Sequence, residues 1–176
     1  MSIKEIITIP NEILTQRTKK VVKIDEEIIK LSQDLLDTLK VAKDPEGAGL
    51  AANQIGESVR MCAVKNFFHD PKNPEKMLSE DFVLINPKII SKSQETDLDW
   101  EGCLSVPNSY GRVYRYMKIK VSAMGLDGNE IQLKASDFFA RTIQHEIDHL
   151  DGILFTDRAY GKLISGEELQ NLEAMV

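Results

Sequence analysis

The 176-residue sequence predicts an α+β fold in which mainly antiparallel sheets pack around a central helix. Two stretches, 25–41 and the one between Ser136 and Gly152, carry apolar residues at helical spacing, and most of the segments between them are predicted to be strands. Because the strands are grouped rather than alternating with helices, antiparallel pairing is favoured over a parallel sheet. The length suits one domain, so residues 1–176 are expected to form a single domain.

The chain is predicted to begin with an extended arm followed by a helix. Residues 1–23 combine a short apolar start with Pro10 and a basic patch, and we expect them to pack across the domain. From Asp25 to about Val41 apolar residues recur on one helix face, and acidic residues fill the first turn, where they oppose the helix dipole. Residues 44–47 are expected to end this helix.

Strands are predicted for much of the middle of the chain. The expected strands are 58–65, 82–90, 112–126 and 130–133, with Pro87 marking an edge or a bulge. Asp127-Gly128 is a hairpin turn signal that joins the last two. Residues 67–81 are polar and contain prolines, so they are expected to form an exposed, mobile loop.

A second long helix is predicted after these strands. Ser136 can cap its start, and Gly152 closes it at a position where a positive φ is favoured. Its buried side would use Phe139, Ile143, Ile147 and Leu150. Further on, Ser165 and Glu168 have the spacing of a capping box, which predicts a short terminal helix.

Charge and composition narrow the class of protein. Acidic residues number 28 against 22 basic ones, and the net charge of −6 argues against a nucleic acid or an anionic membrane as the main partner. No apolar run approaches a membrane span, and the first ten residues lack a secretory signal. A cytoplasmic location is therefore expected. In that reducing compartment Cys62 and Cys103 are expected to stay unpaired.

The stretch QHEIDHLDG, residues 144–152, points most directly to chemistry. On a helix His145 and His149 return to nearly the same face, so both imidazoles can reach one metal ion with Glu146 at its edge. A catalytic zinc-like centre takes three protein ligands and leaves one position to water. Cys103 in EGCLS is the best third ligand, because a thiolate binds such metals strongly.

The other cysteine and histidine positions have competing interpretations. Cys103 could instead be a nucleophile or a small buried apolar residue. A thiol nucleophile needs a base such as histidine, and both candidate histidines already belong to the helix pair, so metal ligation is favoured. Cys62 is expected in the core, because free cysteine is among the most buried residue types. His69 lies in a polar stretch and is expected on the surface.

The small residues of GAGLAANQ, 47–54, allow another backbone to approach closely. The simplest interpretation is a tight connection between a helix and a strand. The stretch lacks the preceding strand and following lysine of a phosphate loop, so nucleotide binding is rejected. A functional interpretation is a strand that lines a site, where a substrate backbone pairs with Gly49 and Gln54 donates an amide N–H.

Taken together, GAGLAANQ, EGCLS and QHEIDHLDG closely resemble the three signature motifs of peptide deformylases. The resemblance extends to PNEIL near the start and to residues 113–116, VYRY, so it spans most of the chain. It implies a metal-dependent hydrolase that removes the formyl group from the N-terminal formylmethionine of new bacterial polypeptides. It also implies one divalent metal ion, typically Fe²⁺, with Zn²⁺, Ni²⁺ or Co²⁺ as possible occupants.

Matched position by position, the resemblance implies metal ligands at Cys103, His145 and His149. It makes Glu146 the catalytic carboxylate, which takes a proton from the metal-activated water and later delivers it to the departing amine. The side-chain amide of Gln54 and the backbone N–H of Leu104 would stabilise the oxyanion.

Substrate selection is expected to come from an apolar pocket for the methionine side chain. Phe138 and Thr142 precede His145 on the same helix face, and Ala48 comes from the first motif. All three are expected to bind this side chain, although core packing would explain them equally. Gly49 would bind the peptide by strand addition, which reads no side chains.

Two departures from the family pattern bear on partners. Tyr110 stands before Gly111, where many members have an arginine, which leaves contacts with the peptide end open. Some relatives dock on the ribosome through a long basic C-terminal helix, whereas this tail is short and acidic and does not support that route.

Two other classes of function remain as alternatives. A zinc metallopeptidase also uses HExxH with a glutamate base, but it would need no Cys103. A non-enzymatic metal-binding module would need a closed site with a fourth ligand.

Overall fold

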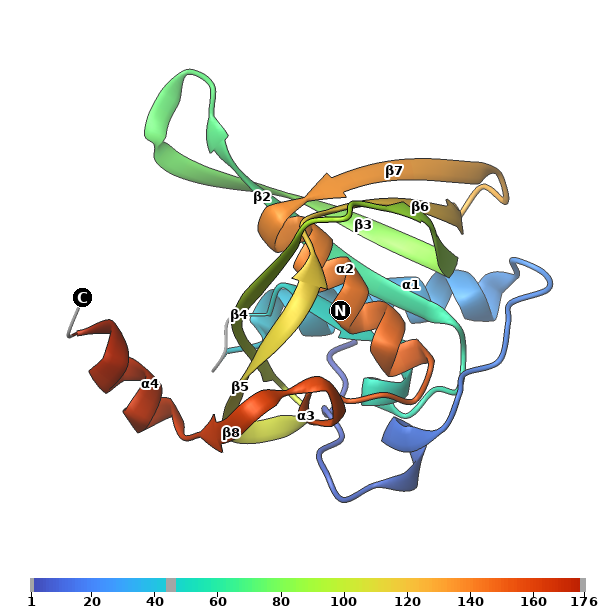
Figure 1. The fold of residues 1–176 in the computed structure, drawn as a ribbon. Coiled ribbons are helices and arrows are strands. Elements are labelled where there is room, and N and C mark those ends of the chain that lie inside the picture. The colour runs from blue at the N-terminus through green and yellow to red at the C-terminus, as the bar shows by residue number, and fades with distance from the viewer. Residues whose placement is uncertain (1, 44–46, 175–176) are drawn as a thin grey trace.

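The computed structural model describes residues 2–43 and 47–174, and it has the predicted α+β architecture (Figure 1). Five strands form one antiparallel sheet in the order β1-β2-β3-β6-β7, and three form a second in the order β4-β5-β8. The strands are β1 Gly49–Ala51, β2 Met61–Asp70, β3 Asn73–Lys92, β4 Thr96–Cys103, β5 Val106–Tyr116, β6 Lys118–Met124, β7 Glu130–Ser136 and β8 Tyr160–Ile164. The helices are η1 Glu12–Thr15, α1 Glu26–Val41, η2 Ala52–Ile55, α2 Asp137–Leu150, α3 Phe155–Arg158 and α4 Gly166–Glu173.

The five-stranded sheet separates two apolar cores because its side chains alternate between its faces. Cys62 and Val64 of β2 face a core shared with α2, whereas Met61 and Ala63 face a core shared with α1. Helix α2 contacts strands of both sheets, so it lies centrally, as predicted (Figure 1). The buried position of Cys62 confirms that it belongs to the core.

The limits of the long helices agree with the sequence signals. Asp25 caps α1 by accepting a hydrogen bond from the N–H of Ile28, and the helix ends at Val41. The predicted stop at 44–47 lies largely outside the described residues, because only Gly47 of it is described. Ser136 is the residue before α2, but its side chain makes no capping hydrogen bond. In α4 the predicted capping box is present.

Gly152 ends the metal-motif helix as predicted, with a φ of +74°. A Cβ atom at this position would lie 2.6 Å from the backbone oxygen of Thr15. The amino-terminal arm therefore packs directly on the end of α2, as the side-chain hydroxyl of Thr18 also shows by donating to the carbonyl of Leu150.

The prediction of a loop at residues 67–81 is wrong. Most of these residues are exposed, but they continue β2 and β3 as a long paired hairpin that projects from the body (Figure 1). The ladder hydrogen bonds need only backbone groups, so polar side chains do not prevent pairing. The tip is stabilised locally, because the carboxylate of Asp70 accepts a hydrogen bond from the N–H of Lys72.

The predicted strand 112–126 is in fact two strands that belong to different sheets. The two strands are separated at Met117. Its N–H donates to the carbonyl of Glu95, and its carbonyl accepts from the N–H of Asp137. Strand β4, strand β8 and helix α3 were not predicted. The bulge expected near Pro87 is confirmed by a register shift between Ile85 and Lys88.

No helix within the described ranges is both long and apolar enough to cross a membrane.

Candidate metal centre

The three sequence motifs converge on one cluster of donor atoms. Cys103 ends β4, whereas His145 and His149 lie one turn apart on α2. The Cys103 sulfur lies 3.1 Å from Nε2 of His149, and the donor atoms of the three residues all lie within 4.8 Å of one another. The cluster is largely buried, with Cys103 and His149 each less than 5% exposed.

Glu101 orients one of these ligands from behind. Its Oε2 lies 2.9 Å from Nδ1 of His145, which leaves Nε2 of that ring for the cluster. Burial opposes ionisation of Glu101, but hydrogen bonds from Arg115 and His145 hold its pKa well below the usual range. A carboxylate at Nδ1 is the common partner of a metal-binding histidine.

In the metal-free cluster, the thiol of Cys103 favours its ionised form and His145 favours its protonated form. Burial opposes ionisation of Cys103, but the charge of His149 and a hydrogen bond from His145 lower the pKa of the thiol well below its usual value. Burial would likewise lower the pKa of His145, yet contacts with Cys103 and Glu101 raise it well above its usual value. Because metals bind thiolate and neutral imidazole, a metal ion would displace the protons that these groups share.

The donor set itself fits a divalent metal ion. One sulfur and two imidazole nitrogens suit zinc and its neighbours in the first transition row. Among the described residues the cluster contains three donors, which leaves a position for water or substrate. A closed four-ligand site, as the metal-binding module requires, is therefore not supported.

Glu146 lies beside the cluster as a buried carboxylate. Its Oε2 has no hydrogen-bond partner among the residues that the structure describes, and burial raises the pKa of its carboxyl group to about 7. The close approach of β1 depends on a glycine, because a Cβ atom on Gly49 would lie 2.4 Å from Oε1 of Glu146. Gly49 thus has a packing role that its sequence context did not reveal.

Gln54 is held so that its amide nitrogen faces the cluster. Its Oε1 accepts a hydrogen bond from the N–H of Ala51 at 2.8 Å. Its Nε2 lies 3.1 Å from Oγ of Ser105 and 3.6 Å from the sulfur of Cys103. Only the N–H that faces Cys103 is therefore available to turn toward a substrate oxygen.

Two polar residues near the site were missed by sequence reasoning. Ser105 contacts Gln54, as described above, and the side-chain amide of Asn53 donates to the backbone oxygen of His149 at 2.7 Å. Both lie within the motifs themselves, where attention went to the metal ligands. His69, in contrast, is exposed on the projecting hairpin, as expected.

A pocket of about 340 Å³ opens onto the cluster. Its lining includes all the residues predicted to bind substrate, together with others that were not predicted. The predicted lining residues are Ala48, Gly49, Gln54, Leu104, Phe138, Thr142 and Glu146; the further ones include Trp100, Tyr110, Arg141 and Leu169. Tyr110, which departs from the family pattern, therefore stands in the pocket wall.

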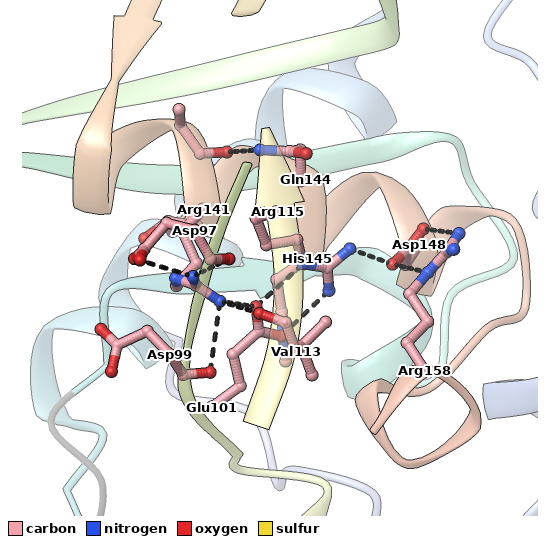
Figure 2. A network of polar contacts seen from close by, with 12 residues as sticks. Asp97, Asp99, Glu101, Val113, Arg115, Arg141, Gln144, His145, Asp148 and Arg158 are labelled. Atoms are coloured by element: carbon pink, nitrogen blue, oxygen red, sulfur yellow. Dashed lines mark hydrogen bonds and ion pairs between the residues drawn. The ribbon is translucent and has the colours of Figure 1, made fainter. Parts of the chain in front are cut away.

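A buried ionic network surrounds Glu101 (Figure 2). Arg115 donates to both oxygens of Glu101, at 2.8 and 2.9 Å, and Arg141 donates to Oε1 at 2.9 Å. Arg115 also contacts Asp148, which lies between the two metal-binding histidines on α2. The sequence contained a signal for this network, since residues two apart on a strand, such as Glu101 and Cys103, share a face.

Comparison with known proteins agrees with this geometry. A family model described as polypeptide deformylase matches residues 3–163. Peptide deformylase of Dictyoglomus thermophilum is 43% identical over 166 residues, covering 94% of this chain and 99% of the relative. That of Thermomicrobium roseum is 39% identical over 180 residues, covering 99% and 98%.

Solved structures show the same relationship. Peptide deformylase from Thermotoga maritima superposes with a TM-score of 0.78 at 31% identity, covering 92% of this chain and 100% of that one. A class I type b peptide deformylase from Acinetobacter baumannii, bound to Met-Ala-Ser, gives 0.78 at 32% identity, covering 90% and 99%. The metallopeptidase alternative finds no support, because the Cys103 sulfur belongs to the cluster and the relatives are deformylases. The chain therefore belongs to the polypeptide deformylase family, the hydrolases that remove formyl groups from polypeptides.

Proposed function

We propose that the substrate is the N-terminal formylmethionine of newly made polypeptides. The observation that carries this proposal is a buried carboxylate, Glu146, with one oxygen unpartnered, beside a three-donor metal centre in a pocket. The related Acinetobacter baumannii structure is bound to Met-Ala-Ser, which supports a peptide beginning with methionine as the occupant of such a pocket.

For the metal we propose Fe²⁺, held by Cys103, His145 and His149. The donor set alone suits Zn²⁺, Ni²⁺ or Co²⁺ as well, so the choice of iron rests on the family resemblance. When bound, a divalent ion supplies Lewis acidity that lowers the pKa of a water molecule toward roughly 7.

Glu146 is the general base and then the general acid in this proposal. It takes a proton from the attacking water and delivers it to the departing amine. A pKa of about 7 suits a group that must accept and release a proton at neutral pH. Its burial supports the role, because the protein excludes bulk water from around the carboxylate.

Gln54 and Leu104 are the proposed oxyanion donors. As water attacks the formyl carbon, negative charge gathers on the formyl oxygen, and preorganised N–H groups stabilise it. The hydrogen bond from Ala51 to Oε1 fixes the Gln54 amide with its nitrogen on the side of Cys103. Leu104 directly follows the metal ligand and lines the same pocket.

The methionine side chain is proposed to lie against Phe138, Thr142 and Ala48. Phe138 is 57% exposed although its ring lines the pocket, so substrate would cover apolar surface that is open in the free protein. The ring is supported from the hairpin, because the centroid of Phe67 lies 6.3 Å from that of Phe138.

The peptide backbone is proposed to pair with β1 at Gly49. Within the described part of the chain this strand is at the edge of its sheet, with β2 as its one neighbour. Backbone pairing would add a strand to this edge without reading side chains, which suits an enzyme that accepts many sequences.

The wider setting follows from the same proposal. We propose that residues 1–176 act as one catalytic domain in the cytoplasm, where new polypeptides are made, with neither a nucleic acid nor a membrane as main partner. Helix α4 carries Glu167 and Glu168 in its first turn and no basic residue in its last turn. This charge gives no support to ribosome docking through the tail.

The test is turnover of formyl-Met-Ala-Ser under anaerobic conditions, with metal analysis of the same sample. We expect formate release and no cleavage of an internally cleavable peptide. Glu146→Ala should keep the metal and lose activity, and Gln54→Ala should lower kcat by roughly a hundredfold to a thousandfold, corresponding to about 2.7 to 4 kcal/mol of barrier. Near-normal turnover in either variant would refute its assigned role.

A further inference from the structure

Helix α3 follows the metal-motif helix α2 in the chain, and its last residue, Arg158, contacts Asp148 of α2 (Figure 2). The Arg158 guanidinium binds Asp148 with two hydrogen bonds, from Nε to Oδ2 and from Nη2 to Oδ1, the latter at 2.7 Å. The Asp148 side chain is 10% exposed, whereas that of Arg158 is 43% exposed. One end of this pair is therefore accessible to solvent and the other is inside the protein.

From Asp148 a continuous set of contacts leads to a metal ligand. Oδ2 of Asp148 also accepts from Nη1 of Arg115. The remaining donors of Arg115, Nε and Nη2, bind the two oxygens of Glu101 at 2.8 and 2.9 Å. Oε2 of Glu101 in turn lies 2.9 Å from Nδ1 of His145. Four side chains thus connect the surface of α3 to the ring of His145.

We propose that Arg158 is a positioning residue for the metal ligand His145, an inference that rests on the metal centre of the proposed function. Arg158 does not touch the cluster. It holds Asp148 in place, so that Asp148 and Glu101 together fix the guanidinium plane of Arg115. Glu101 then presents one oxygen to Nδ1 of His145, which keeps Nε2 directed at the metal.

The geometry explains why losing Arg158 would change the position of the His145 ring. Without it, Oδ1 of Asp148 is a buried carboxylate oxygen that has lost its partner, and Arg115 is the nearest remaining cation in the network. Movement of Arg115 toward Asp148 would weaken its two bonds to Glu101. Arg141 also binds Glu101 at 2.9 Å, so the disturbance should be partial rather than complete.

A second contact from the same helix supports the inference. The ring of Phe155, the first residue of α3, is stacked on that of His145 with centroids 6.3 Å apart and an angle of 21°. Both ends of this four-residue helix are thus linked to His145, one directly and one through the network. Phe155 is 1% exposed and belongs to a core cluster, so Arg158 is the better residue to test.

The test compares Arg158→Ala and Arg158→Lys with Arg17→Ala as a matched control. Arg17 also pairs with an aspartate at the end of α2, Asp151, at 3.2 Å, but this pair has no contact with Glu101. Each full-length variant is loaded with Co²⁺, and two quantities are measured: the rate of Co²⁺ loss to a chelator and the visible absorption of the thiolate-bound ion. Thermal stability of the metal-free form is recorded beside them.

We expect Arg158→Ala to lose Co²⁺ about tenfold faster than the wild type, the lower end of the range for residues that support metal ligands, and to shift the absorption bands. Arg158→Lys keeps the charge without the paired geometry and should fall between the two. Arg17→Ala should match the wild type in both measurements.

A purely structural role for Arg158 predicts a different pattern. Thermal stability would fall while the rate of Co²⁺ loss and the absorption spectrum stayed at wild-type values, and this result would overturn the proposal. If Arg158→Ala does not fold, a wild-type rate and spectrum in Arg158→Lys would overturn it equally. These measurements need no substrate, so failure of the proposed deformylase reaction would be seen separately, as absent formate release in the wild type.

Discussion

Replacing Gly49 with alanine should disable Glu146 while leaving the metal ligands in place. The added Cβ atom would lie 2.4 Å from Oε1 of Glu146 and 2.7 Å from its Cδ and Cγ atoms. Ordinary contact begins near 3.4 Å, so the carboxyl group would have to move by about 1 Å, a displacement that typically costs about a hundredfold in rate. Glu146 is only 3% exposed, so its carboxyl group cannot swing out into solvent to relieve the contact.

The expected result is therefore a kcat about a hundredfold lower, or about 2.7 kcal/mol of barrier, with unchanged metal content. The assay is formate release from formyl-Met-Ala-Ser, with metal analysis of each preparation. Gly125→Ala is the control, because the one tight contact of its Cβ would be with the side-chain oxygen Oδ1 of Asp127, at 2.9 Å in the β6–β7 turn, and its next contacts lie at 3.6 Å and beyond. It should keep wild-type kinetics.

A double-mutant cycle with Glu146→Ala, measured on the residual rate, sharpens the test. Alanine removes all three atoms that the new methyl group would meet, Oε1, Cδ and Cγ, so Gly49→Ala should cost much less in that background than in the wild type. A wild-type kcat in Gly49→Ala would refute the reasoning. Equal costs in both backgrounds would also refute it, since the effect would then not pass through Glu146.

Three further changes have defined outcomes. In the metal-free protein, the free energy of unfolding measured in urea should fall as pH rises from about 4.3 to about 7, because the folded state keeps a proton on Glu146 that the unfolded chain has lost. Glu146→Gln should remove about 3 to 4 kcal/mol of that fall. Parallel pH curves for the two proteins would contradict this. Phe138→Ala should raise KM for formyl-Met-Ala-Ser about tenfold with little change in kcat, and an unchanged KM would exclude the ring from the methionine pocket. Gly152→Ala should lower the free energy of unfolding by about 1 to 3 kcal/mol. The loss should exceed that of Gly128→Ala, because Gly128 shares the positive φ but a Cβ there would have no described atom within 4 Å. Equal losses would show that the contact with Thr15 is unimportant.

The helix-borne part of the site could be predicted because its geometry is local. Four-residue spacing places His145 and His149 on one face of any helix, and the helix limits at Ser136 and Gly152 follow from residue preferences at helix ends. Cys103 was less certain from residues alone, because its distance from the helix depends on the whole fold. The deformylase resemblance favoured Cys103 as the third ligand, and in the structure its sulfur lies 3.1 Å from Nε2 of His149.

The network behind His145 was not predicted, because charged residues in a sequence look like surface residues. Glu101, Arg115 and Asp148 are buried only because they satisfy one another, and such pairing depends on three separate elements coming together. The predictions of a single strand at 112–126 and of a loop at 67–81 were wrong for a related reason. Which strand a segment pairs with is set by backbone contacts across the fold, and alternation of side chains does not report it.

The central claim is that one sulfur and two imidazoles bind a single metal ion that keeps an open position. X-ray absorption at the metal edge of the active, Fe²⁺-loaded protein measures this directly. The account predicts one sulfur ligand, two imidazole nitrogens and at least one light atom from solvent, with the sulfur signal lost in Cys103→Ser. An active protein whose metal shows no sulfur ligand, or a closed shell of four protein ligands, would contradict it.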